Sequence, residues 1–209
     1  MAIRKLVSTP SQAYSNIRSR LISDVGPVWD VINSKQYSPF WLLARSMMPI
    51  AESVGDLIYG DSSSKNLEKL IDNDLSKIRK IYAGKGKVIA QLYRHSFIHQ
   101  DEPRSIYAGN ITIHWNVAFM DGRLHLTTEE KDPRTRSCVM AFDLRTFYQD
   151  LIALLELYEK KGPRRGVVVR YNGWTFLNLN TADLSAANKK EIVSAVREVY
   201  QQDIIKTTA

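Results

Sequence analysis

The chain of 209 residues has one cysteine, Cys138, and its most hydrophobic stretch is interrupted by charge. A single cysteine excludes an internal disulfide framework and a zinc site built from several cysteines, and it suits a reducing compartment. The hydrophobic stretch, residues 38–60, contains Arg45, Glu52 and Asp56. Each such charge costs about 2.5–3.5 kcal/mol at the centre of a bilayer. We therefore expect a cytoplasmic protein that has no membrane partner.

The N-terminal residues lack the continuous apolar core of a secretory signal. Residues 1–23 contain basic residues, several Ser and Thr and no acid, a composition that organellar presequences share. Pro10, followed by a periodic segment, also reads as the opening of a helix. Both interpretations of this segment stay open.

Two familiar ligand motifs are missing. The stretch Gly84-Lys85-Gly86-Lys87 lacks the GxxxxGK[ST] spacing and a preceding strand, so it is interpreted as a solvated turn. No HExxH occurs around His95 and His99, although these lie four residues apart. We expect no metal and no cofactor.

The composition is that of a globular protein, with 44% hydrophobic and 24% charged residues. Lys and Arg exceed Asp and Glu by 29 to 22, a net charge of +7. Long-range attraction would favour a polyanionic partner such as RNA, and simple solubility explains the same charge.

The first half of the chain predicts about four helices. Apolar periodicity and capping residues place them at about 11–33, from Ser38-Pro39 onward, at 67–82 and at 85–100. Gly26-Pro27 should break or kink the first helix, and Pro49 should bend the second.

The second half predicts hairpins and two further helices. Asp121-Gly122 and Asn172-Gly173 each separate alternating segments, over 111–130 and 167–179, which is a strong hairpin signal. A further strand is expected over 137–142, a helix capped by Asp143 up to about 160, and a last helix over 184–205. In the first hairpin, Ile113 and Trp115 would face the core, while His114 and His125 would face solvent.

The fold class predicted is therefore α+β. An N-terminal helical bundle (1–104) carries an α+β extension (105–209), and both pack as one compact unit.

The sequence RHSFIH, residues 94–99, places an arginine and two histidines beside the apolar stripe of the fourth helix. Four interpretations compete: surface residues near the helix C-terminus, a metal site at His95 and His99, a nucleophile pair with Cys138, and a catalytic Arg-His cluster. Cys138 lies in an apolar strand and is more consistent with core packing.

Arg94 and His99 fit an R-x4-H pattern, with a polar residue, His95, directly after the arginine. This pattern, late in a run of about four helices, resembles the HEPN superfamily over residues 10–104. The resemblance implies a metal-independent endoribonuclease, commonly a homodimer, in which His99 acts as acid or base, Arg94 stabilises the anion and His95 is auxiliary. It also implies a toxin or antiviral effector with a possible antitoxin or regulatory partner.

Five arginines are candidates for nucleic-acid binding: Arg134, Arg136, Arg164, Arg165 and Arg170. The last lies near Tyr171 and Trp174, rings that could stack on bases or pair across the predicted hairpin. Because many HEPN proteins are inactive, the alternative function is a non-catalytic nucleic-acid or nucleotide-binding or dimerisation protein.

Overall fold

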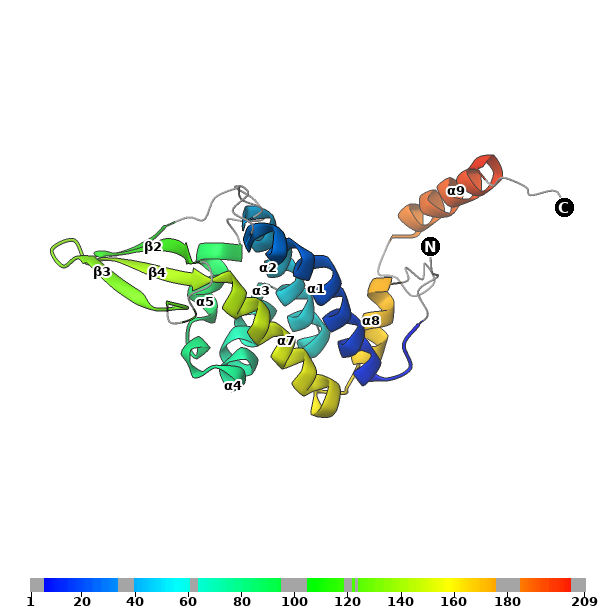
Figure 1. Cartoon of the computed structure of the whole chain (residues 1–209). Helices are drawn as coiled ribbons and strands as arrows, with labels where there is room; N and C mark the ends of the chain where they lie inside the picture. The colour runs from blue at the N-terminus through cyan, green and yellow to red at the C-terminus, as the bar shows by residue number, and fades with distance from the viewer. Residues whose placement is uncertain are drawn as a thin grey trace. The chain divides into compact units, whose positions relative to one another are not determined.

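The computed structural model describes residues 6–33, 40–60, 64–94, 105–118, 122, 124–175 and 185–203. These residues form a mixed α+β structure with a four-stranded sheet (Figure 1). The chain divides into two compact units, one of Val7–Tyr171 and one of Met1–Leu6 with Asn172–Ala209. The expected boundary near residue 104 lies within the larger unit, where residues from both sides of it contribute to one hydrophobic core.

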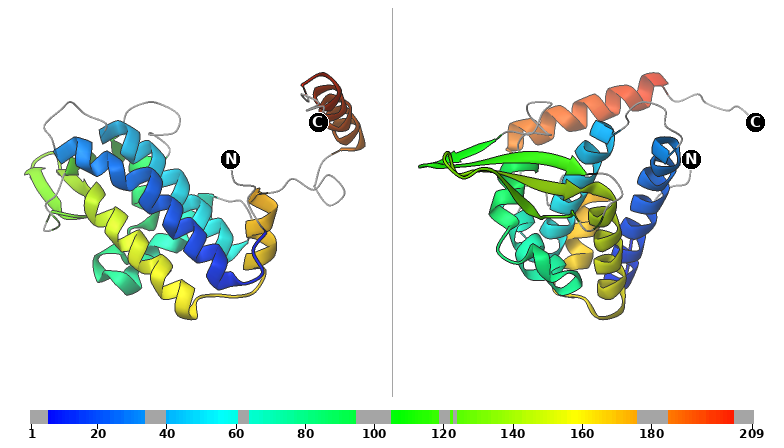
Figure 2. Two further views of the ribbon diagram at one scale, coloured as in Figure 1. Left: turned by 45° about the vertical axis from the view of Figure 1, so that its right-hand side comes forward. Right: turned by 60° about the vertical axis from the view of Figure 1, so that its left-hand side comes forward.

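In the larger unit, α1 (Pro10–Asn33) and α7 (Leu144–Lys161) lie side by side and antiparallel, as Figure 2 shows. Near the start of α1, Arg18 bridges to Glu159 late in α7, with 3.0 Å between Nη2 and Oε2. Near the end of α1, the Trp29 ring packs on Tyr148 with 5.8 Å between centroids. The helix α1 runs on through Pro27, where a break or kink was expected.

The helix α2 (Phe40–Tyr59) contains Pro49 and packs closely on α3 (Ser64–Lys69). A Cβ at Gly55 would lie 2.7 Å from the Asn66 carbonyl oxygen, so only glycine permits this approach. The predicted helix over 67–82 is instead a series of short elements: α3, the π-helix η1 (Leu70–Leu75), α4 (Ser76–Ile78) and the 3-10 helix η2 (Lys80–Tyr82). The next helix begins as α5 (Gly86–Ile89) and continues as the π-helix η3 (Ala90–Arg94).

The sheet contains β1 (Ile106–Ala108), β2 (Ile111–Ala118), β3 (Thr128–Asp132) and β4 (Ser137–Asp143), in the order β1-β2-β4-β3. The predicted hairpin over 111–130 is wrong, because β2 pairs in parallel with β4 and not with β3. Antiparallel pairs join β1 to β2 and β3 to β4. Residues 124–127 form turns, with Leu126 at a positive φ of 56°, so β3 starts only at Thr128.

The second predicted hairpin is also wrong, because residues 167–175 form the helix α8 (Val167–Thr175). Val167 and Tyr171, one helical turn apart, are both buried, whereas Val169 is 76% exposed. Helical spacing thus decides which side chains reach the core, and it overrides the β propensity of three successive valines. The last described helix is α9 (Ala186–Asp203), in the region where a helix was expected.

Several other predictions are confirmed. The strand β4 and the helix α7 occur where expected, and the Asp143 carboxylate caps α7 by accepting the Thr146 N–H at 2.6 Å. Ile113 and Trp115 pack against the core, as do Met140 and Phe142 on β4. Tyr107, on the other face of the sheet, is 75% exposed. Within the described ranges, no helix is both long and apolar enough to cross a bilayer.

Candidate functional site

The structure places Arg94 at the last position of η3, directly after a tightly held residue. Tyr93 is buried, its hydroxyl donates to the Met140 carbonyl at 2.8 Å, and its ring packs on Phe142 with 4.7 Å between centroids. These contacts fix the end of η3 against β4. His95 and His99 lie outside the described residues, so the convergence of Arg94 and His99 stays a prediction.

The π-helical form of η3 bears on this site. A π-helix inserts an extra residue per turn, which shifts the direction of the following side chains, and such segments occur frequently at functional sites. The start of the helix is anchored at Gly86, whose N–H donates to Asp72 Oδ1 at 2.8 Å. Ala83 and Gly84 form an exposed turn, as the sequence indicated for this stretch, whereas Gly86 is buried and starts α5.

His125 was expected on the solvent face, and this prediction is wrong: its side chain is buried. It belongs to a buried polar chain of Tyr82, His125, Asp143 and Asp150, which the exposed Arg79 joins through its ion pair with Asp150. The Asp143 N–H donates to His125 Nδ1 at 3.1 Å, which places the ring proton on Nε2. His125 Nε2 then donates to the Tyr82 hydroxyl at 2.8 Å, and that hydroxyl donates to Asp150 Oδ2 at 3.0 Å.

Burial and ion pairing determine the protonation states in this buried polar chain. Burial lowers the pKa of His125 from 6.5 to about 4, so the imidazole is neutral at pH 7. Burial and the neighbouring Asp150 carboxylate raise the pKa of Tyr82 well above its ordinary value. Arg79 donates to Asp150 from Nε at 2.8 Å and Nη2 at 3.1 Å. The hydrogen bond from Tyr82 in η2 to Asp150 in α7 makes the buried polar chain a link between these two elements, so it holds the first turns of α7 against η2.

A second buried carboxylate, Asp74 in η1, joins three helices. It accepts hydrogen bonds from the hydroxyls of Tyr59 on α2 and Tyr158 on α7, and from Lys77 Nζ at 2.8 Å. Burial raises the pKa of both tyrosines, which therefore stay protonated and donate.

Neither Asp74 nor Asp150 was singled out from the sequence. Asp150 lies on the apolar stripe of α7, three residues after Phe147 and four before Leu154, and a charge in that position is the signal that could have identified it. Among the described residues, no three His, Cys, Asp or Glu side chains lie close enough to share a metal ion.

The five arginines proposed for nucleic-acid binding fall into three settings. Arg134 and Arg136 are exposed in the turn between β3 and β4. Arg164 and Arg165 are exposed in the connection between α7 and α8, beyond the opposite end of α7 (Figure 1). Arg170 donates from Nε at 2.8 Å and from Nη2 at 2.6 Å to the Leu57 carbonyl, and it also contacts the Ile58 carbonyl. Its guanidinium thus caps the C-terminus of α2, and the structure does not bring the five together.

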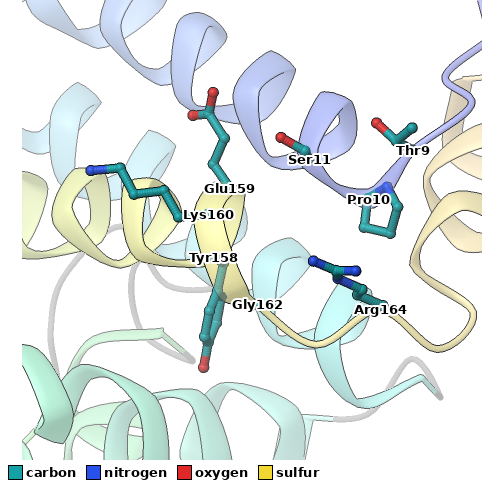
Figure 3. Close-up of a pocket in the computed structure, with 8 residues that line it drawn as sticks. All are labelled: Thr9, Pro10, Ser11, Tyr158, Glu159, Lys160, Gly162 and Arg164. Atoms are coloured by element: carbon teal, nitrogen blue, oxygen red, sulfur yellow. The ribbon is translucent and has the colours of Figure 1, made fainter.

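A cavity of about 310 Å³ lies beside Arg164, between the start of α1 and the end of α7 (Figure 3). It is lined by Thr9, Pro10, Ser11, Tyr158, Glu159, Lys160, Gly162 and Arg164. Residues of two antiparallel helices thus meet at a concave surface that carries both hydroxyl and cationic groups.

Comparisons with known protein families, with curated proteins and with solved structures found no match to the chain.

Proposed function

We propose that the protein is a metal-independent endoribonuclease in which Arg94 and His99 act on the scissile phosphate. The observation that carries the proposal is the R-x4-H spacing at the end of a helix. Arg94 ends a π-helical segment whose preceding residue, Tyr93, is held by β4. The backbone at Arg94 therefore follows directly on a residue that is fixed against the sheet.

The residue types suit cleavage of RNA by its own 2′-hydroxyl. A base removes the 2′-hydroxyl proton, the 2′-oxygen bonds to phosphorus, and the bond from phosphorus to the 5′-oxygen breaks as an acid protonates that oxygen. The products carry a 2′,3′-cyclic phosphate and a 5′-hydroxyl. His99, with an ordinary pKa near 6.5, can serve as base or acid near neutral pH. Arg94 stays charged and can stabilise the negative phosphorane, and His95 is assigned an auxiliary, orienting role.

A homodimer would supply the groups that one chain lacks. Acid and base roles require two proton-transfer groups, and one motif provides a single well-placed histidine together with His95. Two copies related by a two-fold axis would present two arginines and two pairs of histidines at one interface. The proposal therefore includes a dimer in which both copies contribute to the site.

Mutation of the motif tests the proposal. We expect Arg94→Ala and His99→Ala to lower the rate of RNA cleavage by about 100-fold or more each, as loss of a general acid or base or of an anion-stabilising group does. His114→Ala is the matched control, because His114 is half-exposed and bonded to Ser105 at 2.7 Å on the sheet. Equal cleavage by all four proteins, with dimerisation unchanged, would show that the motif is not the catalytic centre.

A non-catalytic nucleic-acid-binding protein is the second candidate, and the net charge of +7 with the exposed Arg164 and Arg165 favours it. In that case RNA affinity falls with rising salt and survives His99→Ala, but weakens when both arginines are neutralised. Measuring RNA affinity at several salt concentrations for the wild type and these variants separates the two candidates.

A further inference from the structure

The lining of the cavity between α1 and α7 contains two cationic side chains, Lys160 and Arg164, and one acidic side chain, Glu159. Glu159, the acid in its lining, already pairs with Arg18, whose Nη2 lies 3.0 Å from Oε2. Within the part of the chain that the structure describes, the Arg164 guanidinium makes no hydrogen bond or ion pair. In Figure 3 it points toward the first turn of α1, whereas Lys160 extends away along α7. The charge that faces the cavity is therefore positive.

The N-terminus of α1 is not itself the binding group, because its donors are largely used within the helix cap. The N–H of Gln12 donates to Thr9 Oγ1 at 3.2 Å, and the Gln12 side chain accepts from the N–H groups of Ser8 at 2.8 Å and Thr9 at 3.2 Å. This reciprocal arrangement is a capping box, and Pro10 has no N–H to offer. Recognition in this cavity must come from side chains, above all from Arg164.

We propose that this cavity binds a phosphate group, with Arg164 as its principal cationic ligand and the Ser11 hydroxyl as a further donor. The planar guanidinium matches two phosphate oxygens at once, which an ammonium does not do. The volume of about 310 Å³ is at the small end of the range for ligand pockets, so the phosphate would belong to a mononucleotide or to the end of an RNA strand. The Pro10 ring supplies an apolar wall.

This site is separate from the R-x4-H motif and does not depend on it. The motif adjoins Tyr93, which contacts β4 immediately before the start of α7. The cavity lies at the other end of α7, whose 18 residues span about 27 Å at 1.5 Å per residue. A phosphate bound there cannot be the scissile phosphate at Arg94 of the same chain.

Two exposed arginines, Arg164 in the cavity and Arg145 outside it, provide a matched test. Titration calorimetry of the full chain with AMP and with inorganic phosphate should show saturable binding of AMP. Arg164→Gln should weaken it by about tenfold or more, the loss expected for a charge-assisted hydrogen bond. Arg145→Gln should leave it unchanged, because Arg145 is also exposed but lies in the first turn of α7 and does not line the cavity. Ser11→Leu, which fills the cavity from α1, should also abolish binding.

The source of the phosphate is distinguished with 2′-O-methyl oligonucleotides, which cannot be cleaved through the 2′-position. A preference for the 5′-phosphorylated strand over the 5′-hydroxyl strand, lost in Arg164→Gln, would assign a strand end. Binding of AMP without that preference would assign a free nucleotide. The proposal is overturned if neither AMP nor phosphate binds saturably, or if Arg164→Gln and Arg145→Gln weaken binding equally. Arg164 would then only balance the carbonyls at the end of α7.

Discussion

The two neighbours of the His125 ring hold it in one tautomer. The Asp143 N–H requires an acceptor at Nδ1, and the Tyr82 hydroxyl accepts the proton of Nε2. A protonated ring would place a second donor opposite the Asp143 N–H. The neutral ring is therefore part of the folded state, although Asp143 and Asp150 nearby favour its charged form.

Acid should destabilise the protein through this histidine. Its pKa is about 4 in the folded state and 6.5 when exposed, so the unfolded chain binds more protons between these values. Above pH 6.5 His125 is neutral in both states and does not reduce stability. As the pH falls from 6.5 toward 4, the free energy of unfolding decreases because of His125, by about 3 kcal/mol at most. Urea unfolding of wild type and His125→Gln at several pH values checks this.

The difference in pH slope between the two proteins isolates His125 from the carboxylates, which titrate in both. We expect a flatter slope between pH 6.5 and 4 for His125→Gln than for the wild type. Parallel slopes for the two proteins would contradict the assignment of a buried, neutral His125.

Tyr82 is the central link of the buried polar chain, since its hydroxyl bonds both His125 and Asp150. Tyr82→Phe keeps the ring but leaves a buried donor and weakens a buried acceptor. We expect the free energy of unfolding to fall by about 1–3 kcal/mol, measured by urea denaturation. Tyr107→Phe, at a site 75% exposed, is the control and should change stability little. If Tyr82→Phe left the free energy of unfolding unchanged, water or another group would have to form the hydrogen bonds to His125 and Asp150.

At the scale of the elements, local patterns predicted α7 and most other helices, but not the helix α8 or the pairing of the strands. The Asp143 cap and the stripe through Phe147 and Leu151 identify α7 because both signals lie within the helix itself. Alternation in β2 correctly predicted that Ile113 and Trp115 face the core. The partner of β2, however, is β4, which runs parallel to it and comes after β3 in the sequence. Pairing between strands separated by another element leaves no local signal, and Asp121-Gly122 favoured a hairpin with the nearer segment.

The segment 167–175 was misassigned for a related reason. The Asn172-Gly173 dipeptide and three valines favour a hairpin locally. The helix is stabilised instead, because its spacing buries Val167 and Tyr171 and lets Arg170 donate hydrogen bonds to α2. The hydrogen bonds to α2 join residues far apart in the sequence, so they could not be predicted from the segment alone. The buried polar chain depends on such contacts in the same way.

Gly173→Ala separates the two conformations of this segment. In the helix α8, a Cβ at Gly173 meets nothing within 4 Å, so alanine should stabilise the helix by up to about 1 kcal/mol. In a two-residue hairpin turn the glycine would need a positive φ, and alanine would be destabilising. An increase in thermal stability and in helical circular dichroism supports α8. A decrease in both quantities would support the hairpin interpretation of this segment.

At the scale of the whole molecule, the larger unit connects the end of η3 to the rest of its core through a few fixed contacts. Tyr93 joins η3 to β4, β4 leads directly into α7, and α7 is braced at its start by the buried polar chain. The sequence predicted Arg94 within a helix over 85–100, and the structure places it in η3, whose π-helical form was not predicted. The placement of His95 and His99 remains a prediction from the R-x4-H spacing.

The most direct test of the central claim is to incubate the purified protein with single-stranded RNA in EDTA and to identify the fragment ends. We expect the wild type to produce fragments ending in 2′,3′-cyclic phosphate with new 5′-hydroxyl ends, and Arg94→Ala and His99→Ala to lose this cleavage while dimerisation persists. RNA that is bound but left intact by the wild type would contradict the account, and so would cleavage that both variants retain.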